Sequence, residues 1–240
     1  MARNTHFQFK QFTVQQDQCA MKVCTDACVL GAWVDVGNAD RILDIGTGTG
    51  LLSLMVAQRN TYAAIDAVEI EAEAFYQAGE NVENSPFNGR ITLFHAAVQD
   101  FTSEYLYDLI ISNPPFFQSD LRSPAEKINQ AHHAETLDFA ALLESIERLL
   151  AQEGRFAVLL PVDEGIQFKK MAAEQKWQLT RELRLFHQQG KKAFRLLMEF
   201  RRAADEIQTT VAETLEIYQA DGVSHHPAFR TLLKDFYLKF

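Results

Sequence analysis

The sequence is poor in cysteine, and its few cysteines do not suggest a disulfide framework or a metal site. Cys19, Cys24 and Cys28 are the only cysteines among 240 residues, whereas small secreted domains that depend on disulfides are rich in cysteine. Their spacing, C-x4-C-x3-C, is not that of a common zinc or iron–sulfur site. We therefore expect no metal site and predict that the cysteines are buried free thiols.

Long hydrophobic runs and an excess of positive charge are also missing. No apolar run approaches the roughly 20 residues that a membrane-spanning helix needs, and the first residues lack the apolar core of a secretory signal. We therefore predict a cytoplasmic protein that does not insert into membranes. The 23 lysines and arginines are outnumbered by 32 aspartates and glutamates, which gives a net charge of -9. Any contact with nucleic acid must therefore come from a local basic patch.

What the sequence does contain is an alternation of strand-like and helix-like stretches, with 47% hydrophobic residues to build a core. From Arg41 onward we expect strands at 41–46, 63–70, 91–96, 107–113 and 155–162, and helices at 51–59, 71–84, 135–154 and 168–176, with Gly154 ending the third helix. Two final strands, 178–187 and 193–202, are joined by the turn-like QQGKK. This order predicts an α/β, Rossmann-like fold: a mostly parallel seven-stranded sheet with helices on both faces and an antiparallel C-terminal hairpin.

A glycine-rich turn follows the first of these strands. Ligands of parallel sheets bind beyond the carboxyl ends of the strands, and LDIGTGTG places Gly46, Gly48 and Gly50 at such an end. Glycines there permit a positive φ and let a ligand approach the backbone closely. Glu69 ends the next strand, where an acid can bind ribose hydroxyl groups. The alternative interpretation is a tight strand-to-helix turn beside a surface glutamate.

The spacing of the glycines helps to distinguish two nucleotide-like ligands. A dinucleotide-binding loop usually reads G-x-G-x-x-G, whereas this loop reads G-x-G-x-G and is preceded by Asp44. A carboxylate beside the loop suits the ammonium and sulfonium groups of S-adenosylmethionine better than the pyrophosphate of NAD. Asp100, which follows the third strand, can accept a hydrogen bond from the adenine amine of such a cofactor. Alternatively, Asp100 caps a loop or a helix.

A proline pair ends the fourth strand, in the stretch IISNPPFF. Pro114 keeps Asn113 extended, and Pro114 and Pro115 fix their own φ and remove two backbone donors. The Asn113 side-chain oxygen and the Pro114 carbonyl then form a rigid pair of acceptors, and Phe116 can stack on a flat ring. This pair suits a planar amine, because accepting both of its N–H groups localises the nitrogen lone pair for attack on a methyl group. The alternative is a proline-broken strand end with core phenylalanines.

DIGTGTG, VEIE and NPPFF, in this order, resemble the motifs of class I S-adenosylmethionine-dependent methyltransferases that modify exocyclic amines. Residues 9–33 and the ending LLKDFYLKF are similar to the bacterial tRNA1(Val) (adenine-37-N6)-methyltransferase family, so the resemblance covers nearly the whole chain. The family commonly has glycine where Cys24 and Cys28 stand, and arginine where His132 stands. The resemblance implies three parts: residues 1–40 pack on the cofactor site, 41–202 form the methyltransferase core, and 203–240 extend the same domain.

The same resemblance implies which residues form the site and what it acts on. It implies a cofactor site around Asp44, Gly46, Glu69 and Asp100, with Thr25 and Asp26 near the methionine part of the cofactor. The implied reaction is methyl transfer to N6 of adenine 37 in tRNA1(Val), beside the anticodon, with the base splayed out to reach Asn113. Enzymes that methylate DNA, rRNA and glutamine side chains share NPPF, so these substrates remain alternatives. An NAD-dependent dehydrogenase and a non-catalytic RNA-binding module are further alternatives.

An acidic protein that binds tRNA must concentrate its positive charge locally. The basic residues that we expect to contact tRNA are Arg122, Lys127, Lys169, Lys170, Lys191 and Lys192, with Arg195 as a further candidate. His132 and His133 can contact phosphates or remain solvated. The sequence leaves the oligomeric state open.

Overall fold

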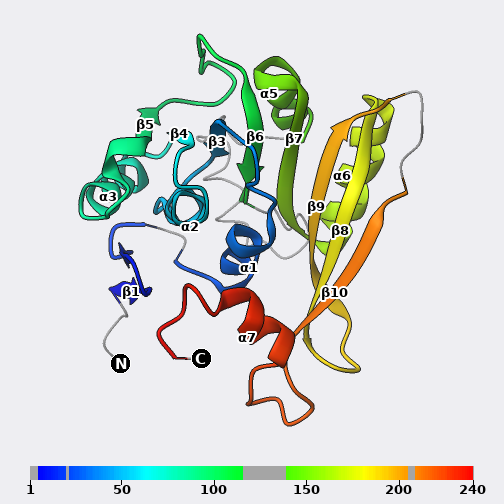
Figure 1. Cartoon of the computed structure of the whole chain (residues 1–240). Coiled ribbons are helices and arrows are strands. Elements are labelled where there is room, and N and C mark those ends of the chain that lie inside the picture. Colours follow the sequence, from blue (N-terminus) through cyan, green and yellow to red (C-terminus); the bar gives the residue numbers. More distant parts are fainter. Residues whose placement is uncertain (1–4, 20–21, 116–138, 205–208, 240) are drawn as a thin grey trace, which may run out of the picture.

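The structure, a computed structural model, describes residues 5–19, 22–115, 139–204 and 209–239. Within these residues, eight strands form one sheet in the order β10-β8-β9-β7-β6-β3-β4-β5, and a separate hairpin is formed by β1 and β2 (Figure 1). The predicted α/β fold with a mostly parallel sheet is confirmed, but the main sheet has eight strands and not seven. No helix of the described residues is long and apolar enough to span a bilayer.

The elements keep the labels of Figure 1. The strands are β1 His6–Gln8, β2 Thr13–Gln15, β3 Arg41–Ile45, β4 Ala64–Glu69, β5 Ile91–His95, β6 Tyr107–Ser112, β7 Leu150–Pro161, β8 Trp177–Gln188, β9 Ala193–Arg202 and β10 Val211–Tyr218. The helices are α1 Thr25–Trp33, α2 Leu51–Arg59, α3 Ala72–Glu83, α5 Phe139–Leu149, α6 Val162–Glu174 and α7 Pro227–Leu233, with a short 3-10 helix at Asn88–Arg90.

The strand directions show at which edge of the sheet the strands have their carboxyl ends, where a ligand is expected to bind. β3 pairs in parallel with β4 and β6, β4 with β5, and β6 with β7. β9 runs antiparallel to both β7 and β8, and β10 runs parallel to β8. Pro161, the last residue of β7, faces Arg195 near the start of β9. The β8–β9 hairpin therefore lies at the same edge as the ends of β3, β4, β6 and β10, which we call the carboxyl edge.

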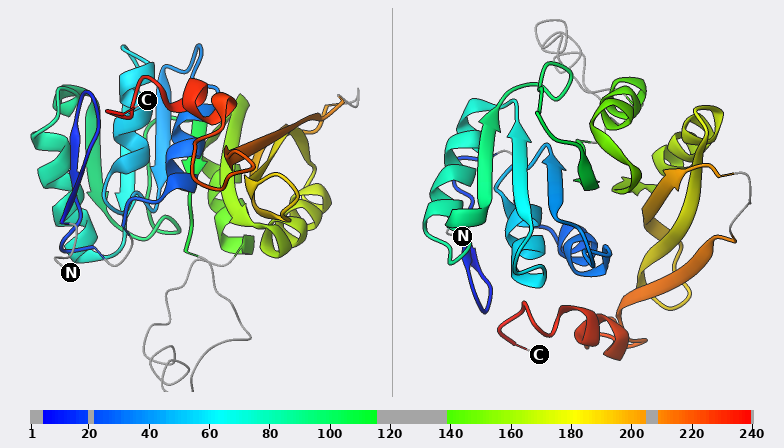
Figure 2. Two further views of the ribbon diagram at one scale, coloured as in Figure 1. Left: turned by 90° about the horizontal axis from the view of Figure 1, so that it is seen from below. Right: turned by 45° about the horizontal axis from the view of Figure 1, so that its top comes forward.

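Two hydrophobic clusters cover the two faces of the sheet, because successive residues of a strand point to opposite faces. Leu109 and Ala157 belong to the cluster that includes residues of α1, α2 and α7. Ile110 and Val158 belong to the cluster that includes residues of α5 and α6. Figure 2 shows these two groups of helices on opposite sides of the sheet. Burial on both faces explains why the central strands are almost continuously apolar in sequence.

Some expectations were wrong in detail. α5 ends at Leu149, and Gly154 lies inside β7 instead of ending a helix. A Cβ at Gly154 would stand 2.8 Å from Cγ of Leu150, so packing explains the glycine. Cys28 is buried as expected, but Cys24 is exposed and Cys19 is half-buried; all three are free thiols.

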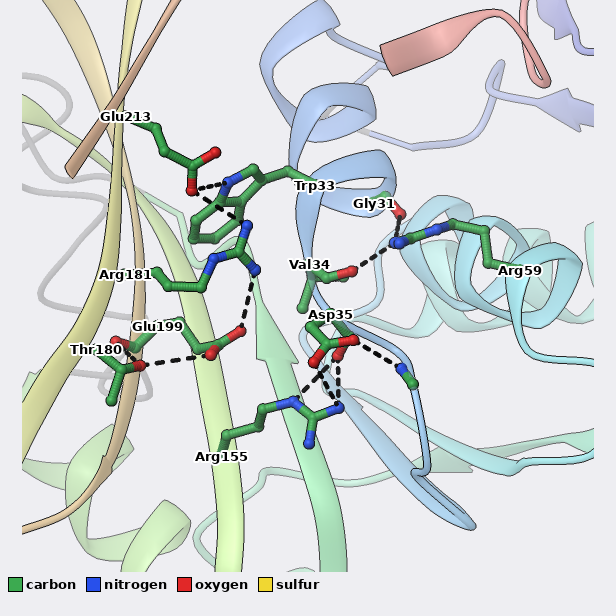
Figure 3. Close-up of polar contacts among 11 residues, drawn as sticks. Gly31, Trp33, Val34, Asp35, Arg59, Arg155, Thr180, Arg181, Glu199 and Glu213 are labelled. Carbon is green, nitrogen blue, oxygen red and sulfur yellow. Dashed lines mark hydrogen bonds and ion pairs between the residues drawn. The ribbon is translucent and has the colours of Figure 1, made fainter. Parts of the chain in front are cut away.

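A polar network fastens the end of α1 to the outer strands of the sheet (Figure 3). Trp33 donates its indole N–H to a carboxylate oxygen of Glu213 in β10 at 3.1 Å. Arg181 of β8 pairs with Glu213 at 3.2 Å and with Glu199 of β9 at 3.6 Å, and its guanidinium lies 4.3 Å from the centre of the Trp33 ring. The unpredicted strand β10 is thereby held to both the sheet and α1.

Two further arginines donate to backbone carbonyl groups at and after the end of α1 (Figure 3). Arg59 of α2 donates to the carbonyl groups of Gly31 and Val34 at 3.0 and 2.6 Å. Arg155 of β7 donates to the Asp35 carbonyl at 2.8 Å. Carbonyl groups at a helix end lack helical partners, so these bonds let α1 end against the sheet.

Candidate active site

Three strand ends that the sequence marked are bonded to one another at the carboxyl edge. The hydroxyl of Ser112, which ends β6, donates to the carbonyl of Ile45, which ends β3, at 2.9 Å. In the loop after β3, the backbone amides of Gly46 and Thr47 donate to the carbonyl of Val68 in β4. Asn113 follows Ser112, and Glu69 follows Val68. Because β3 lies between β6 and β4 in the sheet, these two residues flank the loop on opposite sides.

The glycine loop, residues 46–50, leaves open space where side chains would otherwise stand. Gly46 and Gly48 have φ values of 70° and 57°, which residues with a Cβ rarely adopt. A Cβ built at either position would meet no atom of the described residues within 4 Å, so a ligand can approach the backbone there. At Gly50 a Cβ would lie 3.6 Å from the Cβ of Ala78 in α3, so this glycine also serves the packing of two helices.

Asp44 is completely buried beneath the loop and uses only one of its oxygens. Its Oδ2 accepts hydrogen bonds from the Thr47 hydroxyl at 2.6 Å and from the Ser53 hydroxyl and amide at 2.7 and 3.1 Å. Its Oδ1 is buried and has no partner among the described residues. Burial raises the pKa of Asp44 to about 6, although the hydrogen bonds lower it. A buried carboxylate oxygen without a donor fits a cationic group such as an ammonium.

Glu69 is buried beside the loop and held by three backbone amides. Its Oε2 accepts from Gly48 at 2.7 Å, and its Oε1 accepts from Ile70 and Glu71, both at 3.0 Å. These donors fix the carboxylate where ribose hydroxyl groups are expected. Asp100, by contrast, is exposed in the turn after β5. Its part in binding adenine stays a prediction.

Asn113 presents an oxygen atom that is buried but not bonded. The residue is half-buried, and its Oδ1 is buried without a partner among the described residues. Such an atom costs roughly 1–3 kcal/mol, which a substrate N–H group would offset. Of the two prolines that follow, Pro114 is buried and Pro115 is exposed. The predicted residues that lie outside the described part of the chain are Phe116, Arg122, Lys127, His132 and His133.

Comparison with known proteins decides which family this site belongs to. The model of the methyltransferase small domain matches residues 24–159. A tRNA1(Val) (adenine(37)-N6)-methyltransferase from Dyadobacter fermentans is 71% identical over 240 residues, and the match covers 100% of both chains. This chain belongs to the tRNA1(Val) (adenine(37)-N6)-methyltransferase family.

Further relatives agree with this membership. A protein of the same name from Yersinia enterocolitica is 40% identical over 243 residues, covering 100% of this chain and 95% of the relative. Among solved structures, a predicted O-methyltransferase from Agrobacterium tumefaciens superimposes with a TM-score of 0.68. That match covers 88% of this chain and 96% of the other at 16% identity. The structural likeness therefore shows a shared methyltransferase fold and not a shared substrate.

In this member of the family, buried amide side chains of α3 hold the N-terminal segment beside the glycine loop. Asn81 accepts from the Gln15 amide at 2.7 Å and donates to the carbonyl groups of Gln15 and Thr49, both at 2.9 Å. Gln77 accepts from the Gln18 amide at 2.8 Å. Neither side chain was predicted from the sequence. Their i, i+4 spacing on an amphipathic helix was the available signal, since it puts two polar groups on one face.

The first turn of α1, which the tRNA methyltransferase resemblance places near the cofactor, lies at the carboxyl edge. Asp26 accepts from Nε of Arg195, near the start of β9, at 2.7 Å. Tyr237, in the C-terminal segment, shares side-chain hydrogen bonds with Thr25 and Cys28. Arg195 thus has an ion-pair partner within the protein. The roles of Thr25 and Asp26 toward the methionine part stay predictions.

The described lysines that were expected to contact tRNA differ in their surroundings. Lys191 and Lys192 are exposed in the β8–β9 hairpin at the carboxyl edge. Lys169 pairs with Glu182 at 2.6 Å, and Lys170 is exposed next to it on α6. Because α6 leads away from the carboxyl end of β7, the hairpin lysines are better placed for a substrate bound at Asn113.

Proposed function

We propose that this protein transfers the methyl group of S-adenosylmethionine to N6 of adenine 37 in tRNA1(Val), next to the anticodon. Membership of the family supports the reaction and the substrate. The observation that carries the proposal within the structure is the buried Oδ1 of Asn113, which has no partner among the described residues and stands beside an open glycine loop. A tRNA substrate also implies that the enzyme works in the cytoplasm.

The residues around the loop fit the cofactor. Asp44 Oδ1 would accept from the cofactor's ammonium, and Gly46 and Gly48 leave room for it over the backbone. Glu69 would accept from the ribose hydroxyl groups. Thr25 and Asp26 would lie near the methionine part, and Asp100 would bind the adenine. When bound, S-adenosylmethionine supplies an electrophilic methyl group on a sulfonium.

Asn113 and Pro114 would act on the amine of the target adenine. That amine is a poor nucleophile, because its lone pair is delocalised into the ring. The Asn113 side-chain oxygen and the Pro114 carbonyl accept its two N–H groups, which favours a pyramidal nitrogen with a localised lone pair. The localised lone pair would then attack the methyl group that S-adenosylmethionine, held by Asp44 and Glu69, would supply. The nitrogen becomes acidic only after this attack, so its proton can leave to water without a strong base.

The remaining contacts with tRNA would position the base. Phe116 would stack on the adenine, and Pro115 would keep the motif stiff. The phosphate contacts that we propose are Arg122, Lys127, Lys169, Lys170, Lys191 and Lys192. Phosphate contacts fix the register of a nucleic acid without reading its sequence.

Replacing Asn113 with alanine tests this proposal. Radiolabelled methyl transfer to total tRNA should fall about 100-fold or more in Asn113→Ala, as expected when a preorganised group at the reacting centre is removed. Cofactor binding, measured by calorimetry, should persist because Asn113 faces the amine. Asn88→Ala is the matched control, since Asn88 is exposed in the turn before β5, at the opposite edge of the sheet. Single-turnover rates of Asn113→Ala that equal those of the control would refute the mechanism.

A further inference from the structure

A pocket near the C-terminus is separate from the site described above. Its volume is about 570 Å³. It is formed by three segments: the turn after β10, helix α7, and the tail that follows α7. We call it the C-terminal pocket, and its lining residues are Gln219, Ser224, His225, Arg230 and Lys239.

The side chains that line this pocket are basic, whereas the protein as a whole is acidic. Arg230 and Lys239 bring two positive charges, and His225 adds a ring that can become positive. None of the described lining residues is acidic, although the net charge of the protein is -9. Like charges that share a pocket repel one another. The arrangement therefore favours an anionic ligand.

The wall of the pocket is held in place by packing and backbone bonds. The ring of His225 stacks against Tyr218 and Phe229, with centroids 5.2 and 5.1 Å away and interplanar angles of 18° and 23°. The backbone amide of Gln219 donates to the backbone carbonyl of Ser224 at 2.8 Å, and this bond closes the turn after β10. A ligand would therefore meet a preformed surface, which lowers the entropy cost of binding.

The pocket lies along the same edge of the sheet as the proposed active site. Tyr218, the last residue of β10, faces Gln188 at the end of β8, just before the hairpin that carries Lys191 and Lys192. In the sheet, β10 and β6 are separated by β8, β9 and β7. At about 4.8 Å per strand, the end of β10 stands roughly 19 Å from the end of β6, which Asn113 follows. That distance is too large for contact with the reacting base, but it suits the backbone of the same nucleic acid.

We infer that the C-terminal pocket binds backbone phosphates of the tRNA and, with Lys191 and Lys192, forms one phosphate-binding strip along the carboxyl edge. The inference rests on the proposed function, because it takes tRNA as the polyanion. Arg230 donates through a planar fork that matches phosphate oxygens, and Lys239 adds a point charge. The strip holds the tRNA while Asn113 engages the base.

The double variant Arg230→Gln/Lys239→Gln tests the inference. Its affinity for tRNA should become less sensitive to salt, with a slope reduced by roughly 0.7–0.9 log units per log unit of salt for each phosphate that the variant no longer neutralises. The weaker binding should show as a higher KM for tRNA with little change in kcat, because neither side chain reaches the amine. Filter binding and methyl-transfer kinetics at several salt concentrations measure both quantities.

The matched control is Lys176→Gln/Arg201→Gln, which removes the same charge from the opposite edge of the sheet. Its salt slope should equal that of the wild type. An equal thermal midpoint and cofactor-induced shift in the two double variants would show that both are folded. A pocket variant with the wild-type salt slope and KM overturns the inference while leaving the proposed function intact. A wild type that binds tRNA through the pocket but transfers no methyl group overturns the proposed function alone.

Discussion

Buried oxygen atoms without donors are uncommon in folded proteins, because each costs roughly 1–3 kcal/mol. Within the described part of the chain, Oδ1 of Asp44 and Oδ1 of Asn113 are two such atoms, and their residues lie at the ends of the neighbouring strands β3 and β6. Ligands that donate to these atoms would offset both costs. These two residues are thus where cofactor and substrate would meet the protein.

The raised pKa of Asp44 predicts how cofactor binding depends on pH. The folded-state pKa is about 6, above the ordinary value of 3.8, so the contribution of Asp44 to stability is fully present below the unfolded pKa and is lost as pH rises through about 6. A bound cofactor would reverse this preference, because its ammonium would attract the carboxylate of Asp44. Its affinity should therefore fall about tenfold from about pH 7 to about pH 5, as Asp44 becomes protonated.

Calorimetry across this pH range measures the effect, and Asp44→Asn supplies the control. That variant should bind the cofactor more weakly, and its affinity should not change as pH passes through about 6. An unchanged affinity of the wild type across the same range would show that the charge of Asp44 does not contribute to binding.

Glu69 is the second residue whose replacement should weaken cofactor binding. Glu69→Ala should cost about 1–3 kcal/mol of affinity if its bonds to the ribose are removed, whereas Glu69→Gln, which keeps an acceptor, should cost less. Glu80→Ala, on the exposed side of α3, is a suitable control. Thermal unfolding offers a second readout, since S-adenosylmethionine should raise the melting temperature of the wild type and NADH should not. Equal affinities in Glu69→Ala and the control would remove Glu69 from the site.

Among the elements, the β8–β9 hairpin is one part of the carboxyl edge that we expect to contact tRNA phosphates. Replacing Lys191 and Lys192 with alanine should weaken binding to every tRNA about equally, because phosphate contacts do not read sequence. It should also flatten the salt dependence by roughly 0.7–0.9 log units per log unit of salt for each phosphate that is no longer neutralised. Turnover at saturating tRNA should stay near that of the wild type. Tritium-transfer kinetics at several salt concentrations provide the test, and an unchanged slope would mean that the lysines only keep the hairpin solvated.

Helices and strands could be predicted where a pattern within the segment itself indicates them. The bounds of α2 matched the expected 51–59, because an apolar run follows the glycine loop directly. The helix α1 was not predicted, since eight of its nine residues are buried and its pattern shows no polar face. β10 was missed because only Leu215 and Ile217 are buried in it, and its partner β8 is distant in sequence.

The residues of the site could likewise be predicted where their signal is local in sequence, and not where distant segments meet. The positions of Asp44, Glu69 and Asn113 followed from the rule that ligands bind beyond the carboxyl ends of parallel strands. The pair of Asp26 and Arg195 could not be predicted, because 169 positions separate the two residues and only the finished sheet brings them together. The three segments of the C-terminal pocket likewise converge only once β10 has joined the sheet.

On the scale of the whole molecule, an acidic protein must present its positive charge where the substrate arrives. The net charge is -9, yet Lys191 and Lys192 lie on the carboxyl edge that carries Asn113, and the C-terminal pocket adjoins them. Repulsion elsewhere on the surface would orient an approaching tRNA toward this edge. We therefore expect this edge to bring adenine 37 of a valine tRNA to Asn113.

The most direct measurement of that expectation uses an unmodified valine tRNA transcript, labelled S-adenosylmethionine and digestion of the product to nucleosides. We predict that the label appears in N6-methyladenosine, and that a transcript with guanine in place of adenine 37 accepts none. Label in a different nucleoside, or equal labelling of the guanine transcript, would contradict the proposed reaction.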